Sequence, residues 1–379
     1  MARAADGRLL LLSAPLALFP GEEVEAEVHW KARHGEGTVI RWAKKDRRRV
    51  PAGCPVAATC GGCDLWEAGE AAADLKKSMA ADLLRRQLPD IQNWRYLAAP
   101  ADARRHRIQL HWDGMALGFH RRGSHQIVPV KTCPAAVDPL SRAIPRLLEA
   151  IHGKSLPQRS QRWELATGTP EGRVVAIDEK GHAWLLEPDG WHRDDSEMSE
   201  AFEEFTLRHR AGGFFQVSPA WAVSAFRSVL EGWNLGGGTF FDLYGGVGLF
   251  SALLGKRFQR RVLVEYDIAA VEWAKQNLDQ LKLPSECIAS DIGKWLPDNL
   301  GAAEDVILLD PPRSGLEPEV AAKLLTARAE TMVLVGCDGA AFCRDIKRLG
   351  PAWKLMDLAV LDLFPLTHHV ECVGLLKKG

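Results

Sequence analysis

Alternation of apolar and polar residues marks the first 50 positions as short β-strands. Val24, Ala26 and Val28 alternate with charged and polar residues over 24–30, and apolar runs of strand length cover 9–12 and 37–42. A period of two residues buries one face of a strand and exposes the other. Residues 1–53 are therefore expected to form a small OB-like β-barrel, an architecture that often binds RNA along its backbone.

The next 150 positions mix a helical period with a hairpin signal. Apolar residues recur at helical spacing from Leu75 to Leu84, and Pro89 follows this predicted helix, which covers 65–88. Asp113-Gly114 then separates two apolar runs, as in a β-hairpin. Residues 54–205 are expected to form a central domain.

From about residue 214 the pattern becomes an alternation of strands, loops and helices. Apolar runs of strand length cover 240–244, 261–265, 305–310 and 332–337, and a helical period covers 269–281. Such alternation predicts an α/β domain with a parallel sheet, whose ligands bind at the carboxyl ends of the strands. Residues 206–379 are therefore expected to form a Rossmann-like domain.

Composition excludes a disordered chain, and charge points to an anionic partner for the front of the molecule. The 379 residues are 46% hydrophobic and 26% charged, with a net charge of −1. Residues 1–150 carry 23 basic and 17 acidic side chains, whereas the remainder carries 25 and 32. A locally basic surface attracts a polyanion such as RNA. The arginines expected to contact phosphates are Arg47, Arg48, Arg49, Arg104, Arg105 and Arg107.

No apolar run is long enough for a membrane-spanning helix, which needs about 20 residues. The stretch from Leu9 to Phe19 follows two arginines, as the core of a signal peptide does, but Asp6 lies between them and no A-x-A cleavage site follows. We therefore expect a cytoplasmic protein without membrane contact that acts as a monomer.

Four cysteines form the first group of candidate ligands. Cys54, Cys60 and Cys63 lie within ten residues, and Cys133 lies far downstream. Closely spaced thiolates in a cytoplasmic enzyme indicate a metal site rather than disulfides. Four thiolates suit either tetrahedral zinc or a [4Fe–4S] cluster, and the spacing does not choose between them.

A glycine-rich turn after the run at 240–244 predicts a nucleotide-type cofactor. The turn reads Tyr244-Gly245-Gly246-Val247-Gly248, and Glu265 ends the next predicted strand, where it can accept both ribose hydroxyls. Taken alone, the arrangement suits NAD, FAD or S-adenosylmethionine. Ser251 stands where the dinucleotide fingerprint has its third glycine, which favours S-adenosylmethionine.

Three further groups lie near predicted strands toward the C-terminus. Asp310-Pro311-Pro312-Arg313 places one carboxylate before two rigid prolines, Cys337 ends a buried run, and Glu371 follows two histidines. A lone cysteine at a strand end is more often a small buried side chain than a nucleophile, so the meaning of these residues depends on the whole set.

Taken together, these motifs resemble the RNA uracil-C5 methyltransferase family, which makes 5-methyluridine in ribosomal and transfer RNA. The resemblance covers nearly the whole chain, from a strand region similar to the family's RNA-binding TRAM domain to the C-terminal catalytic motifs. The matching segments are Pro20-Gly21-Glu22, Cys54-Pro55, Cys60-Gly61-Gly62-Cys63, Cys133-Pro134, Phe214-Phe215-Gln216, Asp310-Pro311-Pro312-Arg313, Cys337 and His369-Val370-Glu371. The TRAM-like front end favours the branch acting on 23S rRNA, with tRNA as the alternative substrate.

The resemblance implies a class I S-adenosylmethionine methyltransferase fold and a role for each candidate residue. Cys337 would be the nucleophile that adds to uracil C6, and Glu371 the general base that removes the C5 proton. A [4Fe–4S] cluster would be held by Cys54, Cys60, Cys63 and Cys133. S-Adenosylmethionine and the base would be bound or oriented by Gln216, Tyr244, Glu265, Asp291 and Asp310.

The chain departs from the family at the nucleophile, where Gly336-Cys337-Asp338-Gly339 replaces Ser-Cys-Asn-Pro and predicts a softer loop. Two rival functions stay open. One is an RNA methyltransferase that acts on another base atom, and the other is a non-catalytic RNA-binding assembly factor that kept the fold.

Overall fold

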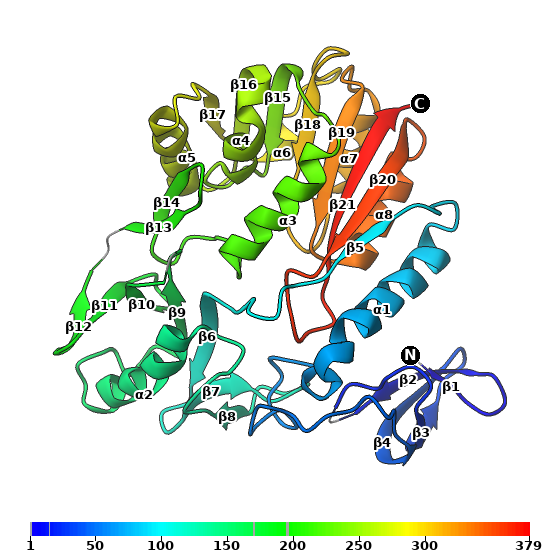
Figure 1. The fold of residues 1–379 in the computed structure, drawn as a ribbon, viewed down its shortest axis with the longest axis vertical. Helices are drawn as coiled ribbons and strands as arrows, with labels where there is room; N and C mark the ends of the chain where they lie inside the picture. Colours follow the sequence, from blue (N-terminus) through cyan, green and yellow to red (C-terminus); the bar gives the residue numbers. More distant parts are fainter. Residues whose placement is uncertain (1, 15, 170, 195–196) are drawn as a thin grey trace.

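A computed structural model describes residues 2–14, 16–169, 171–194 and 197–379, and Figure 1 shows how their sheets are arranged. The N-terminal sheet has the strand order β1-β2-β4-β3, with β2 and β4 parallel. The three strands expected from alternation are confirmed. Within the described ranges β1 and β3 form the two edges of this sheet, so its closure into a barrel remains a prediction. The strands are β1 (Ala2–Arg3), β2 (Leu9–Ser13), β3 (Glu23–Trp30) and β4 (Gly35–Lys44).

A seven-stranded antiparallel sheet forms the middle of the chain, in the order β12-β11-β10-β9-β6-β7-β8. The predicted hairpin is confirmed, because Trp112 pairs with Leu117 and the Asp113 carboxylate accepts hydrogen bonds from two backbone N–H groups of the turn at 2.8 and 2.9 Å. Helix α2 (Asp138–His152) buries its apolar face against this sheet. The strands are β6 (Arg107–Trp112), β7 (Leu117–His120), β8 (Ile127–Pro129), β9 (Arg162–Thr167), β10 (Val174–Asp178), β11 (Ala183–Glu187) and β12 (Gly190–Arg193).

The C-terminal sheet has eight strands in the order β17-β16-β15-β18-β19-β21-β20-β5. The five strands β17, β16, β15, β18 and β19 run parallel to one another, whereas β21 runs antiparallel to both of its neighbours. Its strands are β15 (Gly237–Leu243), β16 (Phe258–Glu265), β17 (Glu286–Ala289), β18 (Val306–Leu309), β19 (Thr331–Gly336), β20 (Trp353–Leu361), β21 (Glu371–Lys378) and β5 (Arg95–Leu97). A short ribbon, β13 (Glu197–Ala201) with β14 (Thr206–Arg210), leads into this part of the chain.

Helices cover both faces of the C-terminal sheet, as Figure 1 shows. Strand β18 is buried at all four positions, which explains why it reads as a continuous apolar run rather than as an alternation. The expected α/β architecture is therefore confirmed. One face packs against α3 (Pro219–Glu231), α4 (Leu249–Leu254) and α5 (Ile268–Gln280), and the other against α1 (Ala72–Gln87), α6 (Ile292–Trp295), α7 (Pro318–Leu325) and α8 (Gly339–Leu349).

The segment 72–97 joins the C-terminal sheet, although the predicted boundaries place it in a central domain of 54–205. Helix α1 packs against α8, and β5 lies beside β20 with Tyr96 paired to Val360. The predicted helix at 65–88 consists of a 3₁₀ segment η1 (Trp66–Ala71) followed by α1, with Gly69 breaking the helical path at φ 51°. A local sequence pattern could not reveal that this early segment joins the C-terminal sheet, because the partner of β5 lies near the C-terminus. No helix in the described ranges is long and apolar enough to cross a membrane.

Candidate active site

Four of the five residues expected to bind or orient cofactor and base lie at neighbouring strand ends of the C-terminal sheet. Tyr244 follows β15, Glu265 ends β16, and Asp310 follows β18. Asp291 comes after β17, which is the edge strand on this side of the sheet. Gln216 differs, because it is half-buried in the loop between β14 and α3. The sheet therefore assembles four of these residues, and the fifth comes from outside it.

The turn after β15 leaves open space against the backbone. Tyr244, Gly246 and Gly248 have φ values of 60°, 51° and 93°. Glycine enters this left-handed region freely, whereas tyrosine does so at a cost. The hydroxyl of Tyr244 donates a hydrogen bond to Glu317 Oε2 at 2.5 Å, which holds the residue in place. A Cβ added at Gly246 would meet no atom within 4 Å, so a ligand has room to approach the chain there.

Glu265 is held between two backbone segments. Its Oε2 accepts a hydrogen bond from the Gly246 N–H at 3.1 Å, and its Oε1 accepts one from the Asp267 N–H at 2.9 Å. The carboxylate therefore has a defined orientation beside the open turn. Asp291 is also held, since its Oδ1 accepts a hydrogen bond from the Lys294 N–H at 3.0 Å and caps α6.

Asp242 is a candidate that the motifs did not single out. It is fully buried, and its Oδ2 accepts hydrogen bonds from the Ser251 N–H at 2.9 Å and from the Ser251 hydroxyl at 2.6 Å. Its Oδ1 has no partner within the described residues, and burial raises the pKa of the carboxyl to about 7. An unsatisfied buried oxygen at the end of β15, together with the open space at Gly246, fits a cofactor bound over this turn.

Cys337 and Glu371 meet across two neighbouring strands. Gly336 at the end of β19 pairs with Cys372 in β21, so Cys337 and Glu371 both adjoin this pair, and the charge of Glu371 acts on the Cys337 thiol. Asp310 follows β18, the strand on the other side of β19. Three chemically active side chains from distant parts of the sequence thus share one end of the sheet.

Burial and mutual repulsion raise the proton affinity of these groups. Burial, with Glu371 and Asp310 nearby, raises the pKa of the Cys337 thiol to about 11, and Arg313 opposes this shift. Burial and Asp310 raise the pKa of Glu371 well above its ordinary value, again against Arg313. The pKa of Asp310 rises to about 7 through burial and the charge of Glu265. A thiol and carboxyl groups that compete for protons are suited to nucleophilic and acid–base chemistry.

The loop after Cys337 is held by a helix cap, which corrects the expectation of a softer loop. The Asp338 carboxylate accepts a hydrogen bond from the Ala341 N–H at 2.8 Å and caps α8. A Cβ added at Gly339 would lie 2.6 Å from Leu83 Cδ2, so α1 occupies the space that a larger residue would need.

Helix α8 also clamps the loop that follows Asp310. The buried Asp345 carboxylate accepts a hydrogen bond from the Leu316 N–H at 2.8 Å, and Arg344 donates one to the Ser314 carbonyl at 2.5 Å. Gly315 between them has φ 76° and leaves no space for a side chain, because its Cβ would lie 2.1 Å from Asp345 Oδ2. The Cys337 loop and the Asp310 loop are therefore positioned by the same helix.

The four predicted ligand cysteines line one small cavity, which also contains Arg105 and encloses about 20 Å³ of free space. The Gly62 N–H donates a hydrogen bond to Cys60 Sγ at 3.4 Å, and Arg105 donates one to Cys63 Sγ at 3.7 Å. Such donors stabilise thiolates in a cluster. All eight cysteines of the chain are free thiols.

The described residues contain no group of three or more His, Cys, Asp or Glu side chains arranged to hold a metal ion, and this finding applies to zinc and to a cluster alike. Tetrahedral zinc, with bonds of about 2.3 Å, would draw its four sulfurs to within about 4 Å of one another. A [4Fe–4S] cluster binds each cysteine through a different iron and so needs the sulfurs farther apart. The choice between the two centres therefore stays as the spacing left it.

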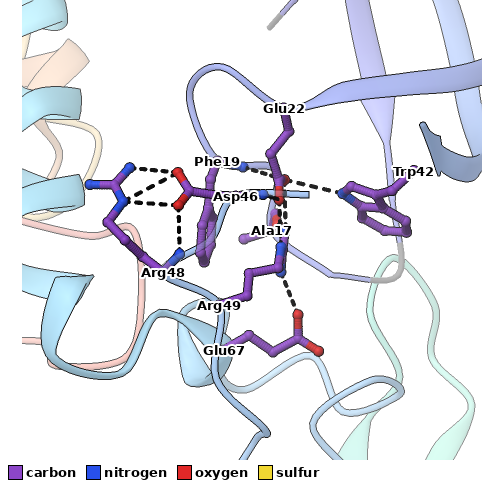
Figure 2. Close-up of polar contacts among 8 residues, drawn as sticks. All are labelled: Ala17, Phe19, Glu22, Trp42, Asp46, Arg48, Arg49 and Glu67. Atoms are coloured by element: carbon purple, nitrogen blue, oxygen red, sulfur yellow. Dashed lines mark hydrogen bonds and ion pairs between the residues drawn. The ribbon is translucent and has the colours of Figure 1, made fainter. Parts of the chain in front are cut away.

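Three of the six arginines expected to contact RNA, Arg49, Arg105 and Arg107, have partners within the protein. Figure 2 shows Arg49 between Glu22 and Glu67, and only 8% of its side chain is exposed. Arg105 donates a hydrogen bond to the Gly62 carbonyl at 2.8 Å, and Arg107 forms an ion pair with Glu164 at 2.7 Å. Contact with a phosphate would require these cations to share or leave their partners in the protein.

The other three are more exposed, but two of them are paired. Arg48 binds Asp46 at 2.7 Å, as Figure 2 shows, and Arg104 binds Asp138 at 2.8 Å. Arg47 is exposed and forms no ion pair with any described residue. A count of positive charges could not make this distinction, because it depends on acidic partners brought close by folding.

The chain is similar in sequence to known RNA methyltransferases. A sequence model of the family described as tRNA (Uracil-5-)-methyltransferase matches residues 301–379. An uncharacterized RNA methyltransferase of Streptomyces avermitilis is 31% identical, covering 100% of this chain and 95% of the relative. The 23S rRNA (uracil(1939)-C(5))-methyltransferase RlmD of Pseudomonas fluorescens is 30% identical, covering 96% and 87%.

A solved structure confirms the class I methyltransferase fold. The Pyrococcus abyssi tRNA (uracil-54, C5)-methyltransferase in complex with S-adenosyl-L-homocysteine superposes with a TM-score of 0.74 at 21% identity, covering 97% of this chain and 95% of that one. At this identity the likeness shows a shared fold. Because relatives at 30% identity and above span almost the whole chain, this protein belongs to the RNA uracil-C5 methyltransferase family.

Proposed function

We propose that this protein transfers a methyl group from S-adenosylmethionine to C5 of a uracil in RNA. The observation that carries the proposal is the register of β19 and β21, in which Cys337 and the buried Glu371 both adjoin the paired residues Gly336 and Cys372. These two groups lie at the same end of the sheet as the open turn at Gly246. Nucleophile, base and methyl donor would therefore meet over neighbouring strand ends.

The proposed cofactor site uses the residues at these strand ends. Glu265 would accept hydrogen bonds from the ribose hydroxyls, with Tyr244 and Asp291 beside it. Asp310, together with Gln216 from outside the sheet, would orient the cofactor and the base. When bound, S-adenosylmethionine supplies an electrophilic methyl group on a positively charged sulfur.

The mechanism follows from what uracil lacks, since its C5 is too weak a nucleophile to be methylated directly. The Cys337 thiolate adds to C6, and the electron pair displaced from the double bond makes C5 nucleophilic. After C5 has taken the methyl group, Glu371 removes the C5 proton. The C6–S bond then breaks, its electrons return to Cys337, and the double bond reforms. The target base must leave its stack to reach these groups.

We also propose that Cys54, Cys60, Cys63 and Cys133 hold a [4Fe–4S] cluster, supported by their shared cavity and its hydrogen-bond donors to sulfur. The methyl transfer requires no electron, so the role of the cluster is structural or RNA-facing. Protein purified without oxygen should be brown and contain about four iron atoms per chain. Stoichiometric zinc without iron would overturn this assignment.

We propose 23S rRNA as the substrate and tRNA as the alternative. The relative from Pseudomonas fluorescens is named as a 23S rRNA methyltransferase, and the solved Pyrococcus abyssi structure is named as a tRNA methyltransferase. A monomer in a reducing cytoplasm accords with the free thiols. Mass-spectrometric mapping of the 5-methyluridine lost on gene deletion identifies the RNA, and light scattering gives the oligomeric state.

Covalent capture tests the proposed reaction. RNA containing 5-fluorouracil should trap the wild-type protein, because fluorine at C5 cannot leave as a proton does. Cys337→Ala should abolish both trapping and methylation. Glu371→Gln should instead accumulate a methylated adduct on ordinary RNA, since only the last step needs the base.

Two outcomes would overturn the proposal. Full turnover by Cys337→Ala would point to methylation of another base atom. Absence of methyl transfer to any RNA from a strain lacking the enzyme would point to a non-catalytic assembly factor.

A further inference from the structure

The loop that carries the proposed base is held by the segment that carries three of the proposed cluster ligands. We call residues 54–65 the cysteine loop and residues 362–370, which lead into Glu371, the base loop. The N–H groups of Asp64 and Leu65 both donate hydrogen bonds to the Leu366 carbonyl, at 2.8 and 2.9 Å. Two loops separated by 300 positions in the sequence thus share a three-centre backbone contact.

Side chains reinforce this contact. Asp64 Oδ2 accepts hydrogen bonds from His368 Nδ1 at 2.5 Å and from the His368 N–H at 3.2 Å. Arg122 forms an ion pair with the same carboxylate and donates a hydrogen bond to the Cys63 carbonyl at 2.6 Å. Asp64 therefore joins the base loop to the cysteine loop at a single side chain.

Helix α1, which follows the cysteine loop, contacts the base loop at a second point. Lys76, which is fully buried, forms an ion pair with Asp362 and donates a hydrogen bond to the Phe364 carbonyl at 3.1 Å. Contacts from the segment 64–76 thus reach every second residue of the base loop from 362 to 368.

The base loop needs such support because Leu366 has φ 67°, in the left-handed region that favours glycine. The carbonyl of this strained residue is the one that accepts both N–H groups from the cysteine loop. Release of that contact would free the loop to relax, five residues before Glu371.

From these contacts we infer that Asp64 is a positioning residue, whose side chain acts through His368 to fix the Glu371 carboxylate over the C5 proton. This inference rests on the proposed function. The rate of proton transfer to a carboxylate falls strongly when the carboxylate is displaced by about 1 Å. Addition of Cys337 and methyl transfer do not require Glu371, so loss of the contact slows one step selectively.

The test measures the rate of elimination relative to the rate of methyl transfer. Asp64→Ala and His368→Ala should accumulate the methylated adduct on ordinary uracil RNA, with elimination slowed about tenfold or more relative to methyl transfer. The double variant should accumulate no more adduct than either single variant, because both remove one contact. Asp74→Ala, which removes an exposed carboxylate on α1, is the matched control and should behave like the wild type.

Iron content is measured in the same samples, since Asp64 adjoins Cys63. His368→Ala leaves the cysteine loop intact and should keep its iron while still accumulating adduct. An adduct seen only in variants that lose iron would overturn the assignment to this contact. So would an equal loss of all steps, which a purely structural role would produce.

Glu371→Gln separates this inference from the function beneath it. If that variant accumulates adduct and Asp64→Ala and His368→Ala do not, only the positioning role fails. If Glu371→Gln accumulates none, the base assignment fails and the positioning role fails with it.

Discussion

At the scale of single residues, folding changes the proton affinity of the groups at this site, and this change determines what chemistry they can perform. Cys337 and Glu371 could be chosen from the sequence only because the whole set of motifs resembles one family. Asp64 and Asp242 could not be chosen in this way. Their importance depends on a partner loop far along the chain and on an oxygen left without a partner, and neither leaves a local pattern.

Stability should depend on pH through Glu371. Burial raises the pKa of this carboxyl in the folded protein, so the folded state binds its proton more tightly than the unfolded state does. Stability is therefore lost as pH rises above the unfolded pKa of about 4.3 toward the folded value. Glu371→Gln has no proton to lose, and its Tm relative to the wild type should rise from pH 5 to pH 8.

Differential scanning fluorimetry at a series of pH values checks this expectation. Glu319→Gln, at an exposed position in α7, is the matched control and should shift the Tm equally at all pH values. A Tm difference for Glu371→Gln that stays constant with pH would show that Glu371 titrates normally.

Secondary structure elements were predicted well where their pattern was long or had a distinct turn. The strands at 240–244 and 332–337 and the Asp113-Gly114 hairpin are examples. Strand β5 has only three residues, Arg95 to Leu97, and carries no alternation by which to identify it. Its existence depends on pairing with β20, which is an interaction between elements rather than a property of either one.

The hairpin of β7 and β8 should be sensitive to one glycine. A Cβ added at Gly118 would lie 1.9 Å from the Val128 carbonyl oxygen, and neither backbone segment can move without breaking the pairing. The end of β7 also binds the cysteine loop, because the Gly61 N–H donates a hydrogen bond to the His120 carbonyl at 2.9 Å. Gly118→Ala should lower the free energy of unfolding by about 3 kcal/mol and reduce bound iron.

Denaturant unfolding and an iron assay on the same preparation measure both effects. Gly172→Ala is the control, since a Cβ there would meet no atom within 4 Å. Normal iron content in a strongly destabilised Gly118→Ala would separate the hairpin from the cysteine loop.

For the whole molecule, the basic front half has two uses that the sequence could not separate. Arg49 joins the N-terminal sheet to η1 through Glu22 and Glu67, and its guanidinium lies 4.0 Å from the ring centre of Phe19 (Figure 2). Arg47 is exposed two positions away. One arginine is part of an interface inside the protein, and the other is available to a phosphate.

Replacement of these two arginines should therefore have opposite consequences. Arg49→Ala leaves buried carboxylates unpaired and should cost about 3 kcal/mol of stability. Arg47→Ala should leave stability unchanged and lower the slope of log K for RNA against log salt by about one unit. Unfolding curves and filter binding across a salt series measure the two effects, and Arg47→Lys should keep the slope of the wild type. A slope unchanged in Arg47→Ala would remove this residue from the RNA surface.

The pairing of β5 with β20 has a consequence for how the protein is made. During synthesis, α1 and β5 leave the ribosome long before their partners α8 and β20 exist. The part of the apolar face of α1 that packs on the C-terminal sheet, with Ala80 and Leu84, stays exposed to solvent or binds a chaperone until the last strands emerge. The cysteines at 54, 60, 63 and 133 all emerge from the ribosome before these last strands do. All four ligands of the proposed cluster are therefore available before the C-terminal sheet is complete, because the base loop and then β21 are the last segments to be made.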